Sequence, residues 1–284
     1  MREAMYWTSE GETVKCKLCP HNCSITEDGI GVCRVRRNLK NKLYSLNYGK
    51  ISSIALDPIE KKPLSRFYPG MNILSIGSLG CNLKCSYCQN WSIAHADPAT
   101  INAEPEQLVK KAVELKDDDN IGIAFTYNEP SIWFEFVYDT VKLSIKEGLK
   151  NVLVTNGFIN NKPLEEILPY IHAMNIDVKA FNNQYYRDIC KGTLEDVKRT
   201  VEISAPKCHV EITTLIVPGL NDNDKEIEQL ASWLGKINPE IPIHFCRYFP
   251  NYKMKDKQST PRQTLEKAKE IAEKYLKYVY IGNI

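Results

Sequence analysis

The chain has 284 residues, of which 43 % are hydrophobic and 25 % charged, and 37 basic against 35 acidic residues give a net charge of +2. Such a composition is typical of a folded protein with one large domain, or one domain and a small module. The near balance of charge argues against a globally basic nucleic-acid binder. No apolar run approaches the ~18 residues of a transmembrane helix, and no secretory signal opens the sequence, so we expect the protein in the cytoplasm.

Residues 1–70 begin with cysteines, continue with a basic stretch and end in short strand-like pieces. Ten cysteines are many for a reducing compartment, where thiols bind metal more often than they form disulfides. Four cysteines at short spacings near the start, C-x2-C-x3-C-x9-C, suit either structural zinc or an iron–sulfur cluster. These cysteines are Cys16, Cys19, Cys23 and Cys33.

Five basic residues follow this cysteine group, from Arg34 to Lys42. A cysteine knuckle with basic neighbours could bind RNA, but only Tyr44 offers a stacking surface nearby. A solvated basic face or a docking surface for a partner protein is therefore the favoured interpretation, and nucleic acid is not an expected partner.

Residues 71–284 alternate between short apolar runs and segments with helical spacing. Strands are predicted at 71–78, 121–125, 151–155, 175–179, 209–217, 241–248 and 278–282. Helices are predicted at 105–116, 131–146, 163–172, 193–204, 223–236 and 261–277. Six βα units predict an α/β fold with a parallel sheet, too few for a closed eight-stranded barrel. We expect a partial (β/α)6 TIM-type barrel at 71–284, with a cysteine-rich N-terminal extension at 1–70.

The second cysteine group lies directly after the first predicted strand of this barrel. Cys81, Cys85 and Cys88 are spaced C-x3-C-x2-C. Three thiolates hold three irons of a cubane cluster and leave the fourth open, whereas ferredoxins supply four cysteines. Zinc would need a fourth ligand, for which His95 is the nearest candidate. The position after a strand of a βα repeat favours the cluster.

This spacing, with Tyr87 directly before the last cysteine, resembles the signature of radical S-adenosylmethionine (SAM) enzymes. The resemblance implies a 4Fe–4S cluster on the three cysteines, whose open iron binds the amino and carboxylate groups of SAM. It also implies reductive cleavage of SAM to a 5′-deoxyadenosyl radical, which abstracts hydrogen from a substrate. In such enzymes the protein supplies position and exclusion while the cofactor supplies the difficult chemistry.

Polar residues follow the second and third predicted strands. Asn128, Glu129 and Pro130 stand where the family often has a Gly-Gly-Glu-Pro-like motif that binds the methionine amino group. A carboxylate near a helix start is favourable in any protein, which is the alternative interpretation of Glu129. Thr155 and Asn156, followed by glycine, resemble the Thr-Asn-Gly of glycyl-radical-enzyme activases, so we expect them at the cofactor as well.

The later strands carry further candidates. Asp177 and Lys179 share one strand face, and their resemblance to the Asp-Leu-Lys of the same activases implies that they line the SAM site, with Lys179 facing its carboxylate. A structural ion pair is the alternative. Glu211 and His244 on the next two strands are expected to contact cofactor or substrate, although a lone histidine is more often a core residue. Cys246 is expected to be a small buried side chain.

Motifs along the whole chain resemble the radical enzyme of the AmmeMemoRadiSam system, which is related to pyruvate formate-lyase activating enzymes. They are CKLCPHNC, DPIEKKPL with FYPG, GCNLKCSYCQN, TYNEP, TNG, EITTLIVPGLND and PIHFCRYFPNY. The resemblance implies Memo-type and AMMECR-type partner proteins and a reductant such as flavodoxin or ferredoxin, with no membrane partner. The expected substrate is a protein, a peptide or a small molecule. Activation of a glycyl radical enzyme is one alternative, and a non-catalytic zinc or iron–sulfur module that binds RNA or protein is another.

Overall fold

An open parallel sheet with helices along its outer face dominates the computed structural model, which describes residues 1–284. Its strand order is β16-β15-β14-β13-β12-β11-β9-β8. All neighbours from β9 to β16 pair in parallel, and β8 pairs antiparallel with β9. Since β16 and β8 are the two free ends of this order, the barrel is partial, as the sequence predicted.

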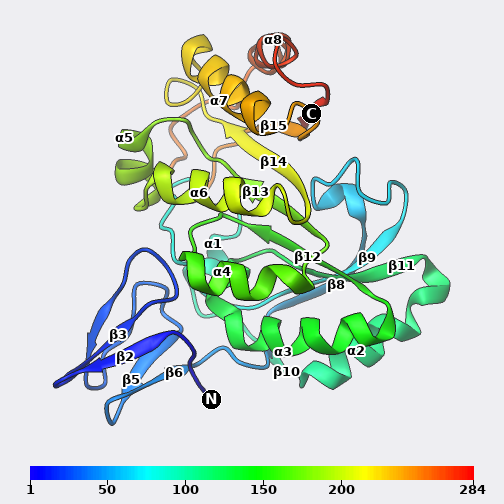
Figure 1. Ribbon diagram of the computed structural model, residues 1–284. Coiled ribbons are helices and arrows are strands. Elements are labelled where there is room, and N and C mark those ends of the chain that lie inside the picture. The colour runs from blue at the N-terminus through cyan, green and yellow to red at the C-terminus, as the bar shows by residue number, and fades with distance from the viewer.

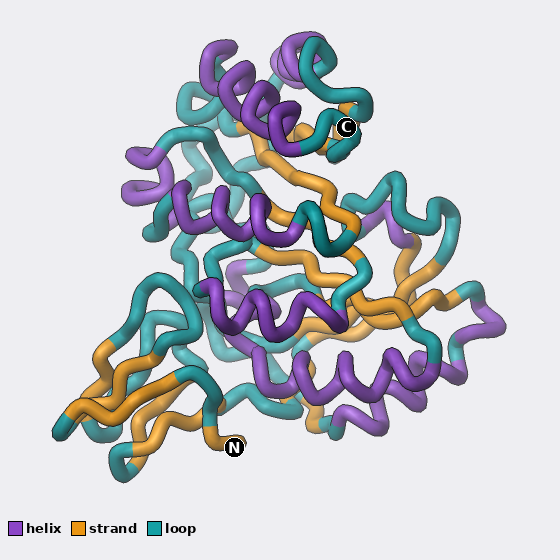
Figure 2. Tube along the Cα trace, viewed as in Figure 1, coloured by secondary structure: helices purple, strands orange, loops and turns teal.

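Each strand and helix predicted after residue 71 has a counterpart in the structure. The counterparts of the predicted strands are β9 (Asn72–Gly77), β11 (Asn120–Phe125), β12 (Lys150–Thr155), β13 (Ala173–Asp177), β14 (His209–Ile216), β15 (Ile243–Arg247) and β16 (Val279–Gly282), and the sheet has one further strand, β8 (Ser53–Pro58). The counterparts of the predicted helices are α2 (Pro105–Glu114), α3 (Phe134–Ser144), α4 (Asn161–Ile167), α6 (Leu194–Ser204), α7 (Asp224–Ile237) and α8 (Arg262–Ala272), and two short helices were not predicted, α1 (Trp91–Ala94) and α5 (Asn183–Tyr185). Figure 2 shows how strands and helices alternate along the trace.

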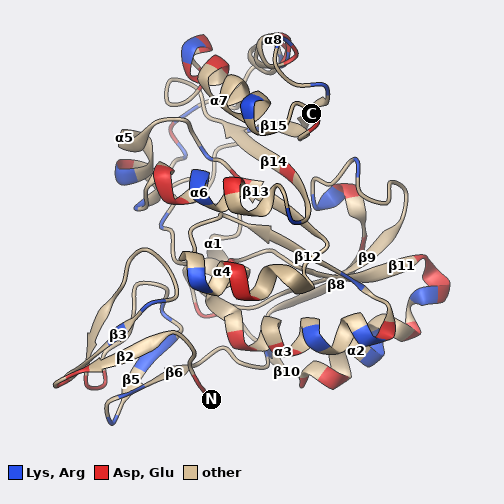
Figure 3. Cartoon of the chain, in the orientation of Figure 1, with Lys and Arg blue, Asp and Glu red and all other residues tan.

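The helices form where apolar residues recur at helical spacing and a favourable first turn starts the segment. Helix α2 begins at Pro105, whose fixed φ suits the first helical position. Its Gln107 side chain accepts the backbone N–H of Glu104 at 2.8 Å. Charged residues of both signs lie on the outer helices, whereas the strands are mostly uncharged (Figure 3). None of the helices is long and apolar enough to cross a membrane.

The first 45 residues form a small domain of two three-stranded sheets beside the barrel (Figure 1). Val14, Ile25, Val35 and Leu43 are buried in it. The sheet orders are β2-β3-β4 and β1-β6-β5, and a further short pair joins β7 to β10. The bounds are β1 (Arg2–Glu3), β2 (Trp7–Glu10), β3 (Thr13–Cys16), β4 (Ser24–Thr26), β5 (Arg36–Leu39), β6 (Lys42–Ser45), β7 (Lys50–Ile51) and β10 (Ile101–Asn102).

A buried ion pair attaches this small domain to the barrel. Arg36 of β5 is 1 % exposed, and its Nη2 lies 2.8 and 2.9 Å from the two carboxylate oxygens of Glu135 in α3. Glu135 also accepts the backbone N–H of Met5 at 2.7 Å. The ring of Tyr6 packs edge-on against Phe134, with 5.1 Å between ring centroids. Helix α3 is thus shared by both parts of the molecule.

The boundary expected at residue 70 does not separate the two parts. Strand β8 lies before that boundary, yet it pairs with β9 along its whole length, from Ser53 with Gly77 to Pro58 with Asn72. The segment after β8 is also bound to the barrel, because Glu211 in β14 accepts the backbone N–H groups of Ser65 and Arg66. Residues 53–70 therefore belong with the barrel, and the small domain ends before β8.

Candidate active site

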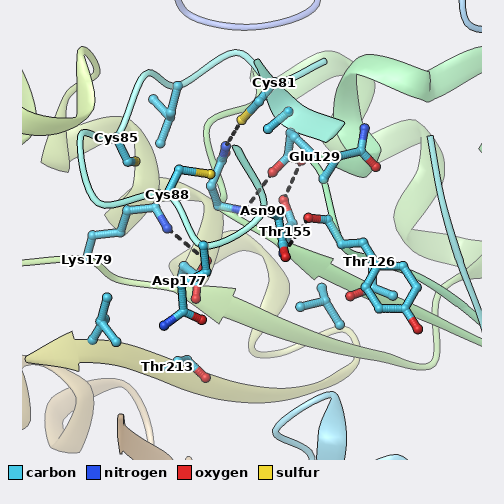
Figure 4. Close-up of a pocket in the computed structure, with 18 of the residues that line it drawn as sticks. Cys81, Cys85, Cys88, Asn90, Thr126, Glu129, Thr155, Asp177, Lys179 and Thr213 are labelled. Carbon is cyan, nitrogen blue, oxygen red and sulfur yellow. Dashed lines mark hydrogen bonds and ion pairs between the residues drawn. The ribbon is translucent and has the colours of Figure 1, made fainter. Parts of the chain in front are cut away.

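A cavity of about 360 Å³ lies at the carboxyl ends of the parallel strands, where βα folds place their sites. Its volume falls within the ~300–1,000 Å³ that is usual for small-molecule sites. Ten residues that the sequence predicted line it: Cys81, Cys85, Tyr87, Cys88, Asn128, Glu129, Thr155, Asn156, Asp177 and Lys179. Figure 4 shows the three thiols on one side, facing the strand ends that carry Thr155, Asp177 and Thr213.

The loop between β9 and α1 carries the three thiols. Cys81 accepts the backbone N–H of Leu83, and Cys88 accepts that of Asn90, so both sulfurs have a donor two residues further along. The side-chain amide of Asn156 approaches Cys81 Sγ at 3.6 Å. Burial raises the pKa of both thiols, and these N–H···S contacts oppose that effect because they stabilise the thiolate form that binds metal.

The thiols surround a space larger than one ion. No three His, Cys, Asp or Glu side chains of the chain are grouped as a single metal ion needs, so His95, although it lines the same cavity, completes no zinc site. Three separated thiols around one cavity are the donor set of a cubane cluster with one iron free of protein ligands. The residues present therefore fit a 4Fe–4S cluster.

Glu129 connects three segments of the cavity wall. It is 1 % exposed, and its carboxylate accepts the backbone N–H of Ser131, the hydroxyl of Thr155 and the backbone N–H of Asn156, at 2.7–2.9 Å. Burial raises its pKa despite these three donors, which lower it. The side chain is held in place at the end of β11 and faces the cavity (Figure 4).

Two asparagines from other segments brace the loop that carries the cysteines. Asn128 accepts the backbone N–H of Ser78 at 3.0 Å and donates to the carbonyl of Gly80 at 3.1 Å. Asn156 donates to the side-chain oxygen of Asn82 at 2.9 Å. Asn128, expected to touch the cofactor, thus also fixes the backbone leading to Cys81, a role that its place in the motif did not indicate.

Asp177 and Lys179 form an ion pair at the end of β13, with 2.9 Å between Lys179 Nζ and Asp177 Oδ2. Both line the cavity (Figure 4). Burial opposes the charge of Lys179, but the negative charges of Asp177 and Cys85 hold its pKa well above the usual value. The lysine therefore stays a cation beside the thiols. The ion pair that the sequence offered as an alternative is present, and the position of both residues at the cofactor stays a prediction.

Glu211 and His244 do not line this cavity, contrary to expectation. Glu211 is fully buried and accepts from His244 Nε2 at 2.6 Å and from His209 Nε2 at 2.9 Å. Its remaining acceptor capacity goes to the backbone of Ser65 and Arg66. Thr213, two residues further along the same strand face, reaches the cavity instead. Glu211 therefore attaches the segment after β8 to the barrel.

The sequence missed one wall of the cavity. Lys61 and Lys62 line it, and both pair with Asp57, at 3.2 and 2.8 Å. Asp57 also accepts the hydroxyl of Tyr127 at 2.8 Å. Tyr127 has φ +68°, a strained value for a tyrosine, at a position where the family often has glycine. The DPIEKKPL motif contains Asp57, Lys61 and Lys62 and could have indicated this wall, but it lies within the N-terminal extension expected at residues 1–70.

The four N-terminal cysteines line a second, separate pocket together with His21 and Arg36. None of the cysteines in the chain forms a disulfide. We call this site, defined by Cys16, Cys19, Cys23 and Cys33, the four-cysteine pocket.

The fold and the three-thiol cavity define a radical SAM protein, and the sequence agrees. The profile of the radical SAM superfamily matches residues 75–234, so the chain belongs to this superfamily. An uncharacterized protein of Methanocaldococcus jannaschii is 42 % identical over 291 residues, covering 100 % of this chain and 86 % of that protein. The pyruvate formate-lyase-activating enzyme of Clostridium pasteurianum is 29 % identical over 218 residues, 70 % of this chain and 87 % of the relative.

Solved structures confirm the fold. A radical SAM methyltransferase from Sphaerobacter thermophilus matches with a TM-score of 0.57 at 15 % identity, covering 99 % of this chain and 75 % of that one. SuiB from Streptococcus suis, bound to S-adenosylmethionine, matches with a TM-score of 0.58 at 13 % identity, covering 75 % and 52 %. The chain is thus an enzyme of the radical SAM superfamily, related in sequence to pyruvate formate-lyase activating enzymes.

Proposed function

We propose that this enzyme holds a 4Fe–4S cluster on Cys81, Cys85 and Cys88 and cleaves SAM reductively. When bound, the cluster supplies the electron that breaks the S–C5′ bond and yields a 5′-deoxyadenosyl radical, which abstracts hydrogen from a protein, peptide or small-molecule substrate. The observation that carries the proposal is the single cavity that joins the three thiols to the polar strand ends. These strand ends offer both charges that the two ionic groups of the methionine moiety require.

The charges in the cavity fit the two ends of an amino acid. Lys179, a cation beside the thiols, offers a partner for the carboxylate of SAM. Glu129, which lines the same cavity, offers its carboxylate to the amino group and is held in place by Thr155 and Asn156. Both side chains are positioned before a ligand binds, which lowers the entropy cost of binding.

Release of 5′-deoxyadenosine under strict anaerobiosis tests this function. The protein is reconstituted with iron and sulfide, reduced with dithionite and given SAM. We expect release by the parent chain and none by Cys85→Ala, with Cys208→Ala as a matched control that keeps all three ligands. A parent chain with a full, reducible cluster and no release in the presence or absence of candidate partners would contradict the proposal.

Activation of a glycyl radical enzyme is the second candidate, supported by the sequence relation to activating enzymes from Clostridium pasteurianum and Escherichia coli. It predicts a glycine-centred radical on a partner protein, visible by electron paramagnetic resonance after incubation with the reduced enzyme and SAM. Absence of that signal together with SAM cleavage would leave the first proposal standing and reject this one.

We also propose the partners that the AmmeMemoRadiSam resemblance implies, Memo-type and AMMECR-type proteins, with flavodoxin or ferredoxin as reductant. The four-cysteine pocket is proposed to bind metal, as zinc or as a second iron–sulfur cluster. Its support is the convergence of four free thiols from the sequence positions that the spacing singled out. Co-purification of the chain with each tagged partner, compared with a surface-charge variant of the small domain, tests the assembly.

A further inference from the structure

The four-cysteine pocket is largely shielded from water. Cys16, Cys19 and Cys33 are 6–8 % exposed, and Leu18 and Ile25 beside them are 1 % and 4 % exposed. Three buried free thiols and the half-buried thiol of Cys23 line one pocket, and packing alone does not require thiols there. A metal centre explains why the chain gathers them.

The sulfurs of this pocket have the same local geometry as those of the active-site loop. Cys16 accepts the backbone N–H of Leu18, and Cys19 accepts that of His21. Cys33 likewise accepts the N–H of Val35, again two residues further along. The active-site thiols Cys81 and Cys88 show this i to i+2 contact too. The two groups of cysteines therefore share one local backbone geometry, in which an N–H two residues further along points at the sulfur.

Two observations distinguish the centre that fits this pocket. No three ligand side chains of the chain are grouped for a single ion, so the four thiols are not arranged as a zinc tetrahedron. Arg36, which lines the pocket, is 1 % exposed and leaves its Nε–H without a partner. An orphaned buried donor calls for an acceptor, and an iron–sulfur core brings bridging sulfides that accept such hydrogen bonds.

We infer that the four-cysteine pocket holds a second iron–sulfur cluster, with all four ligands supplied by the small domain. The inference rests on the metal binding proposed above for this pocket and commits it to iron and sulfide rather than zinc. Arg36 offsets the negative charge of the ligated cluster and donates its free Nε–H to it. Because every iron has a cysteine ligand, this cluster has no open position for SAM.

The second cluster site lies against the back of the active-site loop. The carbonyl oxygen of Cys33 is so close to Gly80 that a Cβ there would approach it to 2.6 Å. His21 Nε2 donates to the carbonyl of Asn82 at 2.7 Å. Gly80 and Asn82 flank Cys81, so the small domain contacts the backbone on both sides of the first ligand of the active-site cluster.

Iron analysis of a variant without the active-site ligands tests the inference. In the Cys81→Ala/Cys85→Ala/Cys88→Ala variant, reconstituted anaerobically, we expect about two to four iron atoms and as many sulfides per chain, the content of a four-cysteine cluster. Its electron paramagnetic resonance spectrum after reduction should not change on addition of SAM. A variant that holds zinc and no iron, or no metal, would overturn the inference.

The converse variant guards against misfolding of the first. Cys16→Ser/Cys19→Ser should lose one cluster's share of iron relative to the parent chain, while the SAM-responsive signal of the remaining cluster persists. Cys208→Ser, which removes a thiol outside both groups, should leave the iron content unchanged. Equal iron in the parent chain and the converse variant would refute the second cluster, yet release of 5′-deoxyadenosine by the parent would still support the proposed function.

Discussion

At the scale of single residues, the active site depends on a buried side chain that contacts one of the three cysteines but does not line the cavity. Cys190 is fully buried at the end of a π-helical turn (Tyr186–Cys190). Its thiol is hydrogen-bonded to Cys85, and the hydroxyl of Tyr87 lies 3.7 Å from its sulfur. Hydrogen bonds to ligand sulfurs help to set the reduction potential of an iron–sulfur cluster, so this position should tune the active-site cluster.

Cys190→Ala should make the reduction potential of the active-site cluster more negative. The hydrogen bond to Cys85 stabilises the reduced cluster, which carries the extra negative charge, and alanine removes it without adding a charge. An electron paramagnetic resonance redox titration of the reconstituted protein measures the change, with Cys208→Ala as the control. A potential equal to that of the control would show that Cys190 only fills space.

Glu211 gives the fold a pH dependence that can be assigned to one carboxylate. Burial would raise its pKa, but hydrogen bonds from His209 and His244 and from the backbone of Arg66 lower it to about 2. A carboxyl whose pKa is lower in the folded state stabilises the fold above its unfolded pKa of ~4.3 and loses that contribution as the pH falls toward the folded value. The contribution at neutral pH is about 3 kcal/mol.

We therefore expect the free energy of unfolding of wild type to exceed that of Glu211→Gln at pH 7, and the difference to shrink as the pH falls from about 5 toward 2. Urea unfolding of both chains at a series of pH values measures it. Glu106→Gln on the exposed face of α2 provides the comparison. A difference between wild type and Glu211→Gln that stays constant down to pH 3 would disprove the assignment.

At the scale of elements, the loop between β9 and α1 must pass between the barrel and the small domain. Gly80 adopts φ +85°, and a Cβ there would meet the carbonyl of Cys33 at 2.6 Å and the side chain of Val35 at 2.8 Å. Gly148, after α3, has φ +71° but nothing within 4 Å of an added Cβ. Substitution of Gly148 by alanine therefore measures the cost of backbone strain alone, whereas the same substitution at Gly80 adds the cost of a clash.

Gly80→Ala should lower the free energy of unfolding by about 2–4 kcal/mol, from ~1 kcal/mol of strain and ~1–3 kcal/mol of overpacking. Gly148→Ala should cost about 1 kcal/mol. Urea unfolding compares the two, and iron content after reconstitution should fall only in Gly80→Ala. Equal losses of stability in both variants would mean that the loop moves away from Cys33 without cost.

The same elements show what a sequence can and cannot predict. The seven parallel strands were predicted because each is a short apolar run next to a helical pattern, and the three-cysteine loop because its spacing is specific. Strand β8 was missed because it is an antiparallel edge strand outside the βα repeat. Thr213 reached the cavity in place of Glu211 because strand period fixes the face of a side chain but not its height along the barrel.

At the scale of the whole molecule, a small cysteine-rich domain and an open barrel share one buried ion pair. The side chains of Arg36 and Glu135 are 1 % and 3 % exposed, so water cannot solvate either charge if its partner is removed. Removal of one partner from such a pair leaves an uncompensated buried charge, which costs about 3–5 kcal/mol. Because Arg36 also lines the four-cysteine pocket, loss of the pair should disturb that pocket as well as the attachment of the domain.

Glu135→Ala should therefore lower the free energy of unfolding by about 3–5 kcal/mol and speed hydrogen exchange in β5 and β6 before it does so in the barrel strands. Glu240→Ala removes the carboxylate of an exposed pair, with Lys277 at 2.9 Å and side chains 54–58 % exposed, and should change stability by less than ~1 kcal/mol. Hydrogen exchange with mass spectrometry shows which strands open first. If a barrel strand opened together with β5, the two parts would unfold as one unit, and the ion pair would not control their attachment.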